Sequence, residues 1–209
     1  KIKYTENFMG DNEDGEYKEF YENGKPHRIG HYNDGEKDGE TKYYFEDSSY
    51  YCSVWYHNGL VTGYSYPGKD GKPVTIIPIQ KGAGNMVCYY ANGTKALECT
   101  YTNGVFDGKR TMYGPDGKVY EDENYHDGDN IGLQKYYYKG GKIKAEENYY
   151  MGDMDGTCTY YYETGKPEHT ESWVAGKRHG AFKYYDKLGK LIKTTTYYDD
   201  DILTEKTGK

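Results

Sequence analysis

The chain has 209 residues and a formal net charge of −7, with 34 acidic and 27 basic residues. Without a basic stripe, this balance argues against a surface for nucleic acid or anionic membrane, and no apolar run approaches the roughly 18 residues that cross a bilayer. Only 35% of the residues are hydrophobic but 29 are tyrosines, so we expect a folded chain with a thin core in which half-buried tyrosine supplies most of the apolar surface.

The sequence is built from eight copies of one repeat, marked by three columns of glycine. The spacing is 24 residues except across the third copy, where it falls to 21. Each copy has two runs rich in Tyr, Lys and Thr, which suit β-strands, separated by Asn-Gly, Asp-Gly and Gly-Lys pairs, which suit tight turns. The first glycine column, with which each copy begins, is Gly15, Gly39, Gly63, Gly84, Gly108, Gly132, Gly156 and Gly180.

In chain order, we expect an N-terminal half-copy (1–14), two regular copies (15–61), a degenerate copy (62–85), five regular copies (86–203) and a tail (204–209). Because the links are short, successive hairpins should pair as antiparallel neighbours with no second layer over either face. The predicted fold is all-β: an elongated single-layer antiparallel β-meander built from about eight 24-residue hairpin repeats, with essentially no helix.

The third copy, TGYSYPGKDGKPVTIIPIQKG, breaks the pattern with three prolines and a cluster of β-branched residues that includes Ile76 and Ile77. Proline cannot donate a ladder hydrogen bond, so a strand that carries it needs a bulge or an edge position. We expect a kink or gap near residues 64–85. Two interpretations stay open: a decayed copy without function, or a segment that binds a partner.

Two aromatic columns run through the copies, and their rings are expected to stack as ladders in place of a core, or else to form a stripe for a ligand. Two-residue turns would put the columns on opposite faces, whereas a bulge would put them on one face. The first column is Phe20, Tyr44, Tyr89, Tyr113, Tyr137, Tyr161 and Tyr185; the second is Tyr32, Tyr56, Tyr101, Tyr125, Tyr149, Trp173 and Tyr197, with Ile79 in the third copy.

Motifs for catalysis and metal binding are missing from the sequence. The six histidines form no HExxH, and the acidic turns at 10–16, 126–130 and 198–201 do not complete a calcium loop. There is no glycine-rich phosphate loop before a helix and no nucleophile elbow. We therefore predict no catalytic residue, no metal site and no cofactor.

The cysteines lack metal-ligand spacing, but one pair is a candidate disulfide. Cys88 and Cys99 flank the Asn92-Gly93 turn on the two strands of one hairpin, and we expect them to face each other at a separation that is wide for a disulfide but adjustable. The alternative is a pair of buried thiols.

The copy D-G-x-x-x-x-Y-Y-x-x-G-K-x(9)-Y-x-x-G resembles the MORN repeat variant of bacterial proteins, a relative of the membrane occupation and recognition nexus repeat, over about residues 1–203. The resemblance implies an elongated antiparallel β-ribbon and a role in binding or scaffolding, and the family includes antitoxin-like members. Its recurring residues build turns and ladders, so it implies no catalytic residue. Together with the absence of Met at position 1, it favours an exported or cell-envelope bacterial protein over a cytoplasmic one.

We expect a non-enzymatic protein-binding or scaffold protein that uses an extended tyrosine-rich sheet surface. The alternatives are an antitoxin-like protein that masks its partner and a membrane-surface MORN protein. The expected partner is a protein or else a glycan, with nucleic acid excluded and membrane lipid disfavoured, and the open sheet edges would allow a homodimer. The candidate partner-binding residues are Tyr89, Tyr113, Tyr137, Tyr161, Tyr185, Ile76 and Ile77.

Overall fold

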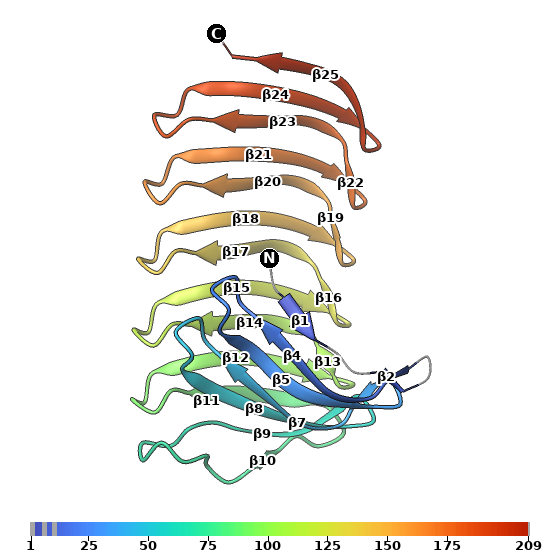
Figure 1. Cartoon of the computed structure of the whole chain (residues 1–209), viewed down its shortest axis with the longest axis vertical. Helices are drawn as coiled ribbons and strands as arrows, with labels where there is room; N and C mark the ends of the chain where they lie inside the picture. Colours follow the sequence, from blue (N-terminus) through green and yellow to red (C-terminus); the bar gives the residue numbers. More distant parts are fainter. Residues whose placement is uncertain (1–2, 6–7, 10–11, 209) are drawn as a thin grey trace. The chain divides into compact units, whose positions relative to one another are not determined.

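The structure is a computed structural model that describes residues 3–5, 8–9 and 12–208, with side chains from residue 13 onward. Every regular element in these residues is a β-strand, and the strands follow one another as antiparallel hairpins (Figure 1). This confirms the predicted all-β antiparallel meander of hairpin repeats. None of the described residues belongs to a helix that could cross a membrane.

The sixth copy shows how one repeat folds. Strand β17 (Gly132–Tyr137) turns into β18 (Ile143–Tyr150), and the Gly141 amide donates to the Tyr138 carbonyl at 2.7 Å within the turn. At the far end of β18, Met151 and Gly152 have φ values of 49° and 85°. Two successive positive φ values define the two-residue turn whose twist matches a hairpin. The second glycine column, which includes Gly141, and the third, which includes Gly152, therefore mark the two turns of this copy.

The chain divides into two compact units, one comprising Lys1–Gly108 and Met112–Gly117 and the other Lys109–Thr111 and Lys118–Lys209. In the N-terminal unit, the first sheet has the order β1-β4-β5-β7-β8-β9-β10, with β6 paired to β5. Strands β2 and β3 form a separate two-stranded sheet. These strands are β1 (Lys3–Thr5), β2 (Phe8–Met9), β3 (Asn12–Glu13), β4 (Gly15–Phe20), β5 (Pro26–Asn33), β6 (Glu36–Lys37), β7 (Gly39–Tyr44), β8 (Tyr50–His57), β9 (Leu60–Ser65) and β10 (Ile77–Pro78).

A second meander begins with β11 (Gly84–Tyr89), β12 (Lys95–Thr102) and β13 (Val105–Phe106) of the N-terminal unit. The division between the units falls within β14 (Gly108–Tyr113). No pairing joins β10 to β11 among the described strands, so the first sheet ends inside the 64–85 region where the sequence predicts a kink or gap. Pro78 lies in β10, which is the edge strand of that sheet, where a missing amide costs no ladder bond.

The N-terminal unit also contains a second layer, which differs from the single layer predicted for the whole chain. Strand β8 lies against β11 and β12, and the rings of Tyr51 and Tyr90 are 6.0 Å apart. The thiols of Cys52 and Cys88 interact there, and both are fully buried. The short links of regular copies do not predict this packing, because it arises where the irregular third copy interrupts the sheet. The apolar residues buried in this unit include Tyr51, Cys52, Val54, Val61, Met86, Cys88, Leu97, Cys99 and Tyr101.

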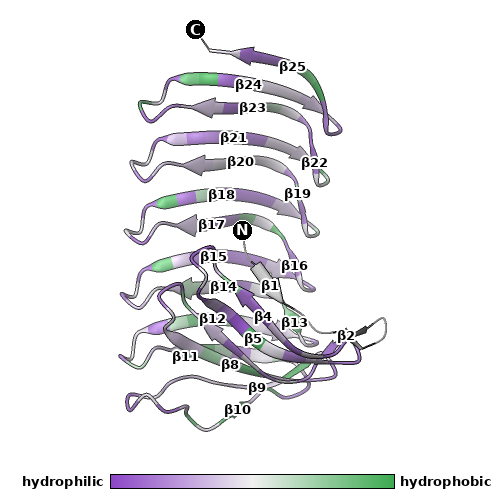
Figure 2. Cartoon of the chain, viewed as in Figure 1, coloured by the Kyte–Doolittle hydropathy of each residue, from purple (hydrophilic) through white to green (hydrophobic). Residues whose placement is uncertain are grey.

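The C-terminal unit forms one sheet in the order β15-β17-β18-β20-β21-β23-β24-β25, with short strands β16, β19 and β22 paired to β15, β18 and β21. Most of its strands are coloured between purple and white in the hydropathy view, so the sheet has few strongly hydrophobic residues (Figure 2). The remaining bounds are β15 (Val119–His126), β16 (Asp129–Asn130), β19 (Asp153–Met154), β20 (Gly156–Tyr161), β21 (Pro167–Val174), β22 (Lys177–Arg178), β23 (Gly180–Tyr185), β24 (Leu191–Tyr198) and β25 (Asp201–Thr207).

Successive copies are joined at both ends of their strands by hydrogen bonds that recur with the repeat. At the turn between the two long strands of a copy, a tyrosine hydroxyl donates to a carbonyl of the next copy in four cases. At the other turns, a backbone amide donates to the carbonyl 22 residues earlier. The first set is Tyr21 to Tyr44 (2.9 Å), Tyr90 to Tyr113 (2.8 Å), Tyr138 to Tyr161 (2.5 Å) and Tyr162 to Tyr185 (2.7 Å). The second includes Gly152 to Asn130 (3.0 Å), Gly176 to Met154 (2.9 Å) and Asp200 to Arg178 (3.0 Å).

Replacing Tyr162 by Phe should lower the free energy of unfolding by about 0.5–1.5 kcal/mol, because it removes the hydroxyl that donates to the Tyr185 carbonyl. Urea denaturation followed by circular dichroism measures the change. The matched control is Tyr150→Phe, whose side chain is 62% exposed. Equal losses in the two variants would contradict a stabilising role for the bond.

Candidate binding surface

The two aromatic columns lie on opposite faces of the sheet. Glu146 and Glu147 are neighbours on β18 and therefore point to opposite sides. The Tyr161 hydroxyl of the first column donates to Glu146 at 2.8 Å, whereas the Tyr149 hydroxyl of the second column donates to Glu147 at 3.0 Å. We name the two sides the Tyr137 face, which carries the first column, and the Tyr149 face, which carries the second.

A bulge is present, yet it does not bring the columns together. Tyr136 pairs with Ala145 and Tyr137 with Ile143, so the extra residue lies next to the Gly-Lys turn. Between Gly132 and Tyr136 the register to β18 is regular, with Gly132 directly opposite Tyr149. Tyr137 is an odd number of residues from Gly132, so it points away from the Tyr149 face.

The prediction that the rings of one column stack on one another is wrong. Equivalent residues of adjacent copies lie two strands apart, about 9.5 Å, which exceeds the roughly 7 Å reach of ring contacts. In the last two copies, rings of the second column instead meet a ring of the strand between. Phe182 on β23 lies 5.5 Å from Trp173 and 4.8 Å from Tyr197, measured between ring centres.

The predicted partner-binding tyrosines are half-buried, and Tyr113 and Tyr161 donate hydrogen bonds to glutamates. The Tyr113 hydroxyl donates to Glu98, and the Lys95 ammonium lies 5.6 Å from the centre of the Tyr113 ring. Ile76 and Ile77 are not brought to this column, because they lie at β10 of the first sheet; Ile76 is 48% exposed. The tyrosines of this set are Tyr89 on β11, Tyr113 on β14, Tyr137 on β17, Tyr161 on β20 and Tyr185 on β23.

The Tyr149 face of the C-terminal unit carries a row of carboxylates that the sequence prediction missed. Each glutamate lies two residues before a second-column aromatic residue and accepts a hydrogen bond from it, so the recurring Glu-x-aromatic pattern was the signal. The donors are the Tyr125 hydroxyl to Glu123 (3.1 Å), the Tyr149 hydroxyl to Glu147 (3.0 Å) and the Trp173 indole N–H to Glu171 (3.0 Å).

Burial keeps the phenols of this face in their neutral, hydrogen-donating form. It raises the pKa of Tyr125 to about 12, with the nearby Glu123 charge as the next cause. Burial likewise raises the pKa values of Tyr136, Tyr149 and Tyr160, and the charge of Glu123 or Glu147 adds to it. A phenol that resists ionisation remains a donor to its carboxylate over the whole physiological pH range.

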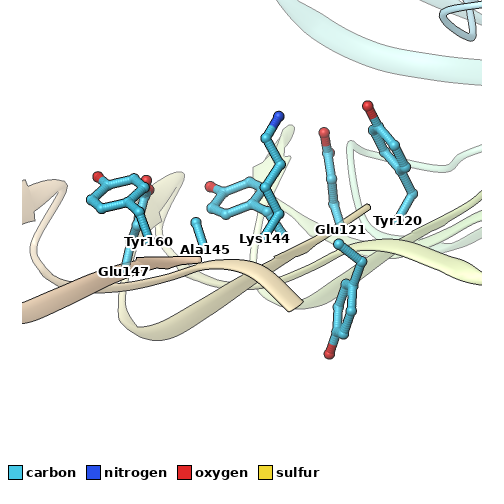
Figure 3. A pocket seen from close by; sticks show the side chains of 8 residues that line it. Tyr120, Glu121, Lys144, Ala145, Glu147 and Tyr160 are labelled. Atoms are coloured by element: carbon cyan, nitrogen blue, oxygen red, sulfur yellow. The ribbon is translucent and has the colours of Figure 1, made fainter. Parts of the chain in front are cut away.

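A cavity of about 280 Å³ opens on the Tyr149 face. Figure 3 shows Tyr160, Glu147, Lys144 and Tyr120 rising from the same side of the sheet around it. It combines ring surfaces with two carboxylates and one ammonium group. Its lining residues are Tyr120, Glu121, Tyr136, Tyr137, Lys144, Ala145, Glu147 and Tyr160.

Next to the cavity, the imidazole of His169 is held between two phenol rings. It stacks on Tyr160 with ring centres 4.3 Å apart and planes at 12°, and on Tyr184 at 5.7 Å and 21°. Its Nε2 lies 3.6 Å from a carboxylate oxygen of Glu171. Flat aromatic groups are therefore already accommodated between neighbouring strands of this face.

Comparison with protein families matches the MORN repeat variant at residues 13–34, 106–127, 131–149, 154–174 and 178–204. These matches cover more than half of the chain. The chain belongs to the MORN repeat variant family. No curated protein matches its sequence. Membership of this family indicates a repeat protein that serves as a scaffold or binding module.

The cysteines of this MORN repeat variant protein do not pair as the sequence suggested. In the observed register Cys88 lies opposite Leu97 and Cys99 opposite Met86, so the two thiols are diagonal rather than directly opposed. Because the hairpin is centred on Asn92-Gly93, Cys88 pairs with Leu97, which lies two residues before Cys99. All four cysteines are free and buried.

Native protein should therefore resist alkylation by iodoacetamide at all four cysteines, and a reductant should not change its mass. Burial raises the pKa of Cys158 to about 11 and that of Cys88 above its ordinary value, which keeps these thiols protonated and unreactive. Mass spectrometry with and without denaturant measures this, and unfolding should expose four alkylation sites. A mass gain of two hydrogens on reduction would contradict the free-thiol state.

Alkali should destabilise the protein through its tyrosines. A phenol whose folded pKa exceeds the ordinary value of about 10 stabilises the fold fully below pH 10 and loses that contribution as pH rises through the folded pKa. Because burial raises the pKa values of Tyr50 and Tyr125 to about 12, the urea midpoint should stay level up to about pH 10 and fall toward pH 12.

Tyrosinate absorbance should rise together with that fall. Tyr125→Phe removes one of the groups that ionise and should make the decline shallower. A urea midpoint that stays constant across this pH range would contradict the role assigned to the buried phenols.

Proposed function

We propose that this protein is a non-enzymatic binding protein that holds a partner polypeptide on the tyrosine-rich faces of its C-terminal sheet. The observation that carries the proposal is that this unit is one sheet whose two faces present half-buried aromatic side chains in successive copies. Tyrosine offers a large contact area at a small entropy cost. Several of these phenols are already held by carboxylates, as Tyr149 and Tyr161 are, which lowers the cost of ordering them on binding.

The chemistry of the described residues supports binding rather than catalysis. A catalytic site needs a nucleophile beside a base, or a general acid and base with matched pKa values. The cavity on the Tyr149 face instead carries phenols whose pKa values burial has raised, and the buried thiol of Cys158 has its pKa raised to about 11. Such groups are good hydrogen-bond donors and poor nucleophiles at neutral pH.

A protein partner is favoured over lipid or nucleic acid by the charge of the chain. The formal net charge is −7, and the Tyr149 face carries the glutamates Glu123, Glu147 and Glu171. Anionic membranes and nucleic acids would be repelled by such a face. A polypeptide can match both the rings and the carboxylates.

Site-specific photo-cross-linking in the cells that produce the protein tests the proposal. A photoreactive phenylalanine analogue is placed at Tyr137, at Tyr160 or at Leu188, one at a time. The analogue keeps an aromatic ring at the two tyrosine positions, and Leu188 is exposed in a turn, so the fold should persist. We expect a defined polypeptide to be captured from Tyr137 or Tyr160 and not from the control position Leu188, which is 81% exposed.

Capture of the same proteins from all three positions, or of none, would contradict a partner-binding face. If the protein co-sediments with anionic vesicles at physiological salt and gives no cross-links, its partner is a membrane surface and not a polypeptide.

A further inference from the structure

On the Tyr149 face of the C-terminal unit, the fifth copy supplies a cation to its own carboxylates. Arg110 on β14 donates to Glu121 at 2.9 Å and also to Glu123. The side chain of Glu123 is only 9% exposed and that of Arg110 15%. The Arg110 guanidinium is therefore held by two carboxylates, one of which also accepts a hydrogen bond from the Tyr125 hydroxyl.

The next two copies keep the glutamate and lose the arginine. Glu147 and Glu171 are the equivalents of Glu123, but Gln134 and Cys158 stand where Arg110 stands. No lysine or arginine among the described residues lies within ion-pair distance of Glu147, and Glu171 has only His169, at 3.6 Å. Two carboxylates of this face are thus left without the cation that the neighbouring copy provides.

The other basic side chains near this face either have an ion-pair partner or line the cavity. Lys193 contacts Glu205 at 2.8 Å, and Arg178 contacts Asp200 at 3.0 Å. Lys144 lines the cavity and has no ion-pair partner among the residues that the structure describes. Its equivalent in the next copy is the acidic Glu168. Negative charge therefore exceeds positive charge over the sixth and seventh copies of this face.

The cavity beside Glu147 has the chemistry that suits a lysine or arginine side chain. The rings of Tyr136 and Tyr160 line it, and ring faces attract cations. The protein uses the same contact elsewhere on this face, where the Arg178 guanidinium lies 4.6 Å from the centre of the Tyr197 ring. A carboxylate next to ring faces binds a cation more strongly than either group alone.

We propose that this face binds an extended polypeptide with basic side chains at every third residue, which place cations against Glu147 and Glu171. The proposal rests on the proposed function and specifies its partner. Equivalent carboxylates lie two strands apart, about 9.5 Å. An extended chain that crosses the strands rises about 3.1 Å per residue in the polyproline II form, or about 9.3 Å in three residues.

Fluorescence anisotropy with the full chain and labelled synthetic peptides tests the proposal. The probe is a short proline-containing peptide with lysine at every third position, and the comparison peptide has the same composition with its lysines clustered at one end. The regularly spaced peptide should bind more tightly, and its affinity should fall as salt is raised. Equal binding of both peptides, or binding of neither, would overturn the proposal.

Charge variants locate the site. Glu147→Gln and Glu171→Gln should each weaken binding of the spaced peptide by about three- to tenfold, whereas Lys144→Glu, at an exposed side chain, should strengthen it. The matched control is Glu163→Gln, which makes the same charge change at an exposed turn. Unchanged affinity in all three face variants, or an equal loss in the control, would overturn the proposal, as would binding to anionic vesicles in place of the peptide.

The outcome is separable from that of the proposed function. If Tyr137 gives cross-links but the regularly spaced peptide does not bind, the proposed partner-binding function stands. The proposal of a basic peptide on the Tyr149 face is then rejected.

Discussion

Pairing between successive hairpins is the interaction on which the rest of this molecule depends. An isolated two-stranded hairpin is marginal in water, because it buries too little on either face. Here neighbouring copies within a sheet are joined by ladder hydrogen bonds, and several copies add a phenol that reaches the following copy, as Tyr162 reaches the Tyr185 carbonyl. At the opposite turn an amide such as that of Gly176 reaches back to the preceding copy. Stability is therefore a property of neighbouring copies, as in other repeat proteins.

The face that carries the second aromatic column differs between the two units. In the N-terminal unit the face is covered by a second layer, and Val54 and Cys99 are buried at the repeat position that Glu147 holds in the sixth copy. In the C-terminal unit the same position is acidic in three successive copies, and each carboxylate accepts a hydrogen bond from an aromatic neighbour. An apolar layer over Glu147 and Glu171 would leave their charges without solvation or a cation. The charges of this face therefore make it unsuited to a dry core.

Three consecutive tyrosines show how the repeat divides its work. Tyr160 stacks on His169 on one face, Tyr161 donates to Glu146 on the other, and Tyr162 bonds to the next copy. Tyr160 and Tyr161 point to opposite faces because side chains alternate along a strand. Tyr162 follows the end of β20, so its side chain does not obey this alternation. Tyrosine suits all three places because it combines a ring to pack with a hydroxyl to donate.

The sequence by itself determined the strands, the turns and the antiparallel order of the meander, because glycine at positive φ and the recurrence of each copy are local properties that neighbouring residues settle. It also located the interruption in the third copy, where proline cannot join a ladder. Only the tertiary structure decided that the aromatic columns lie on opposite faces, that Cys88 is opposite Leu97, and that β8 lies against β11 and β12. The recurring glutamates Glu123, Glu147 and Glu171 can be read from the sequence. That they lie on the same face as the cavity depends on the strand register and on the position of each bulge. Those quantities are set by pairing between distant residues, and a change of one residue reverses the side to which every later side chain points.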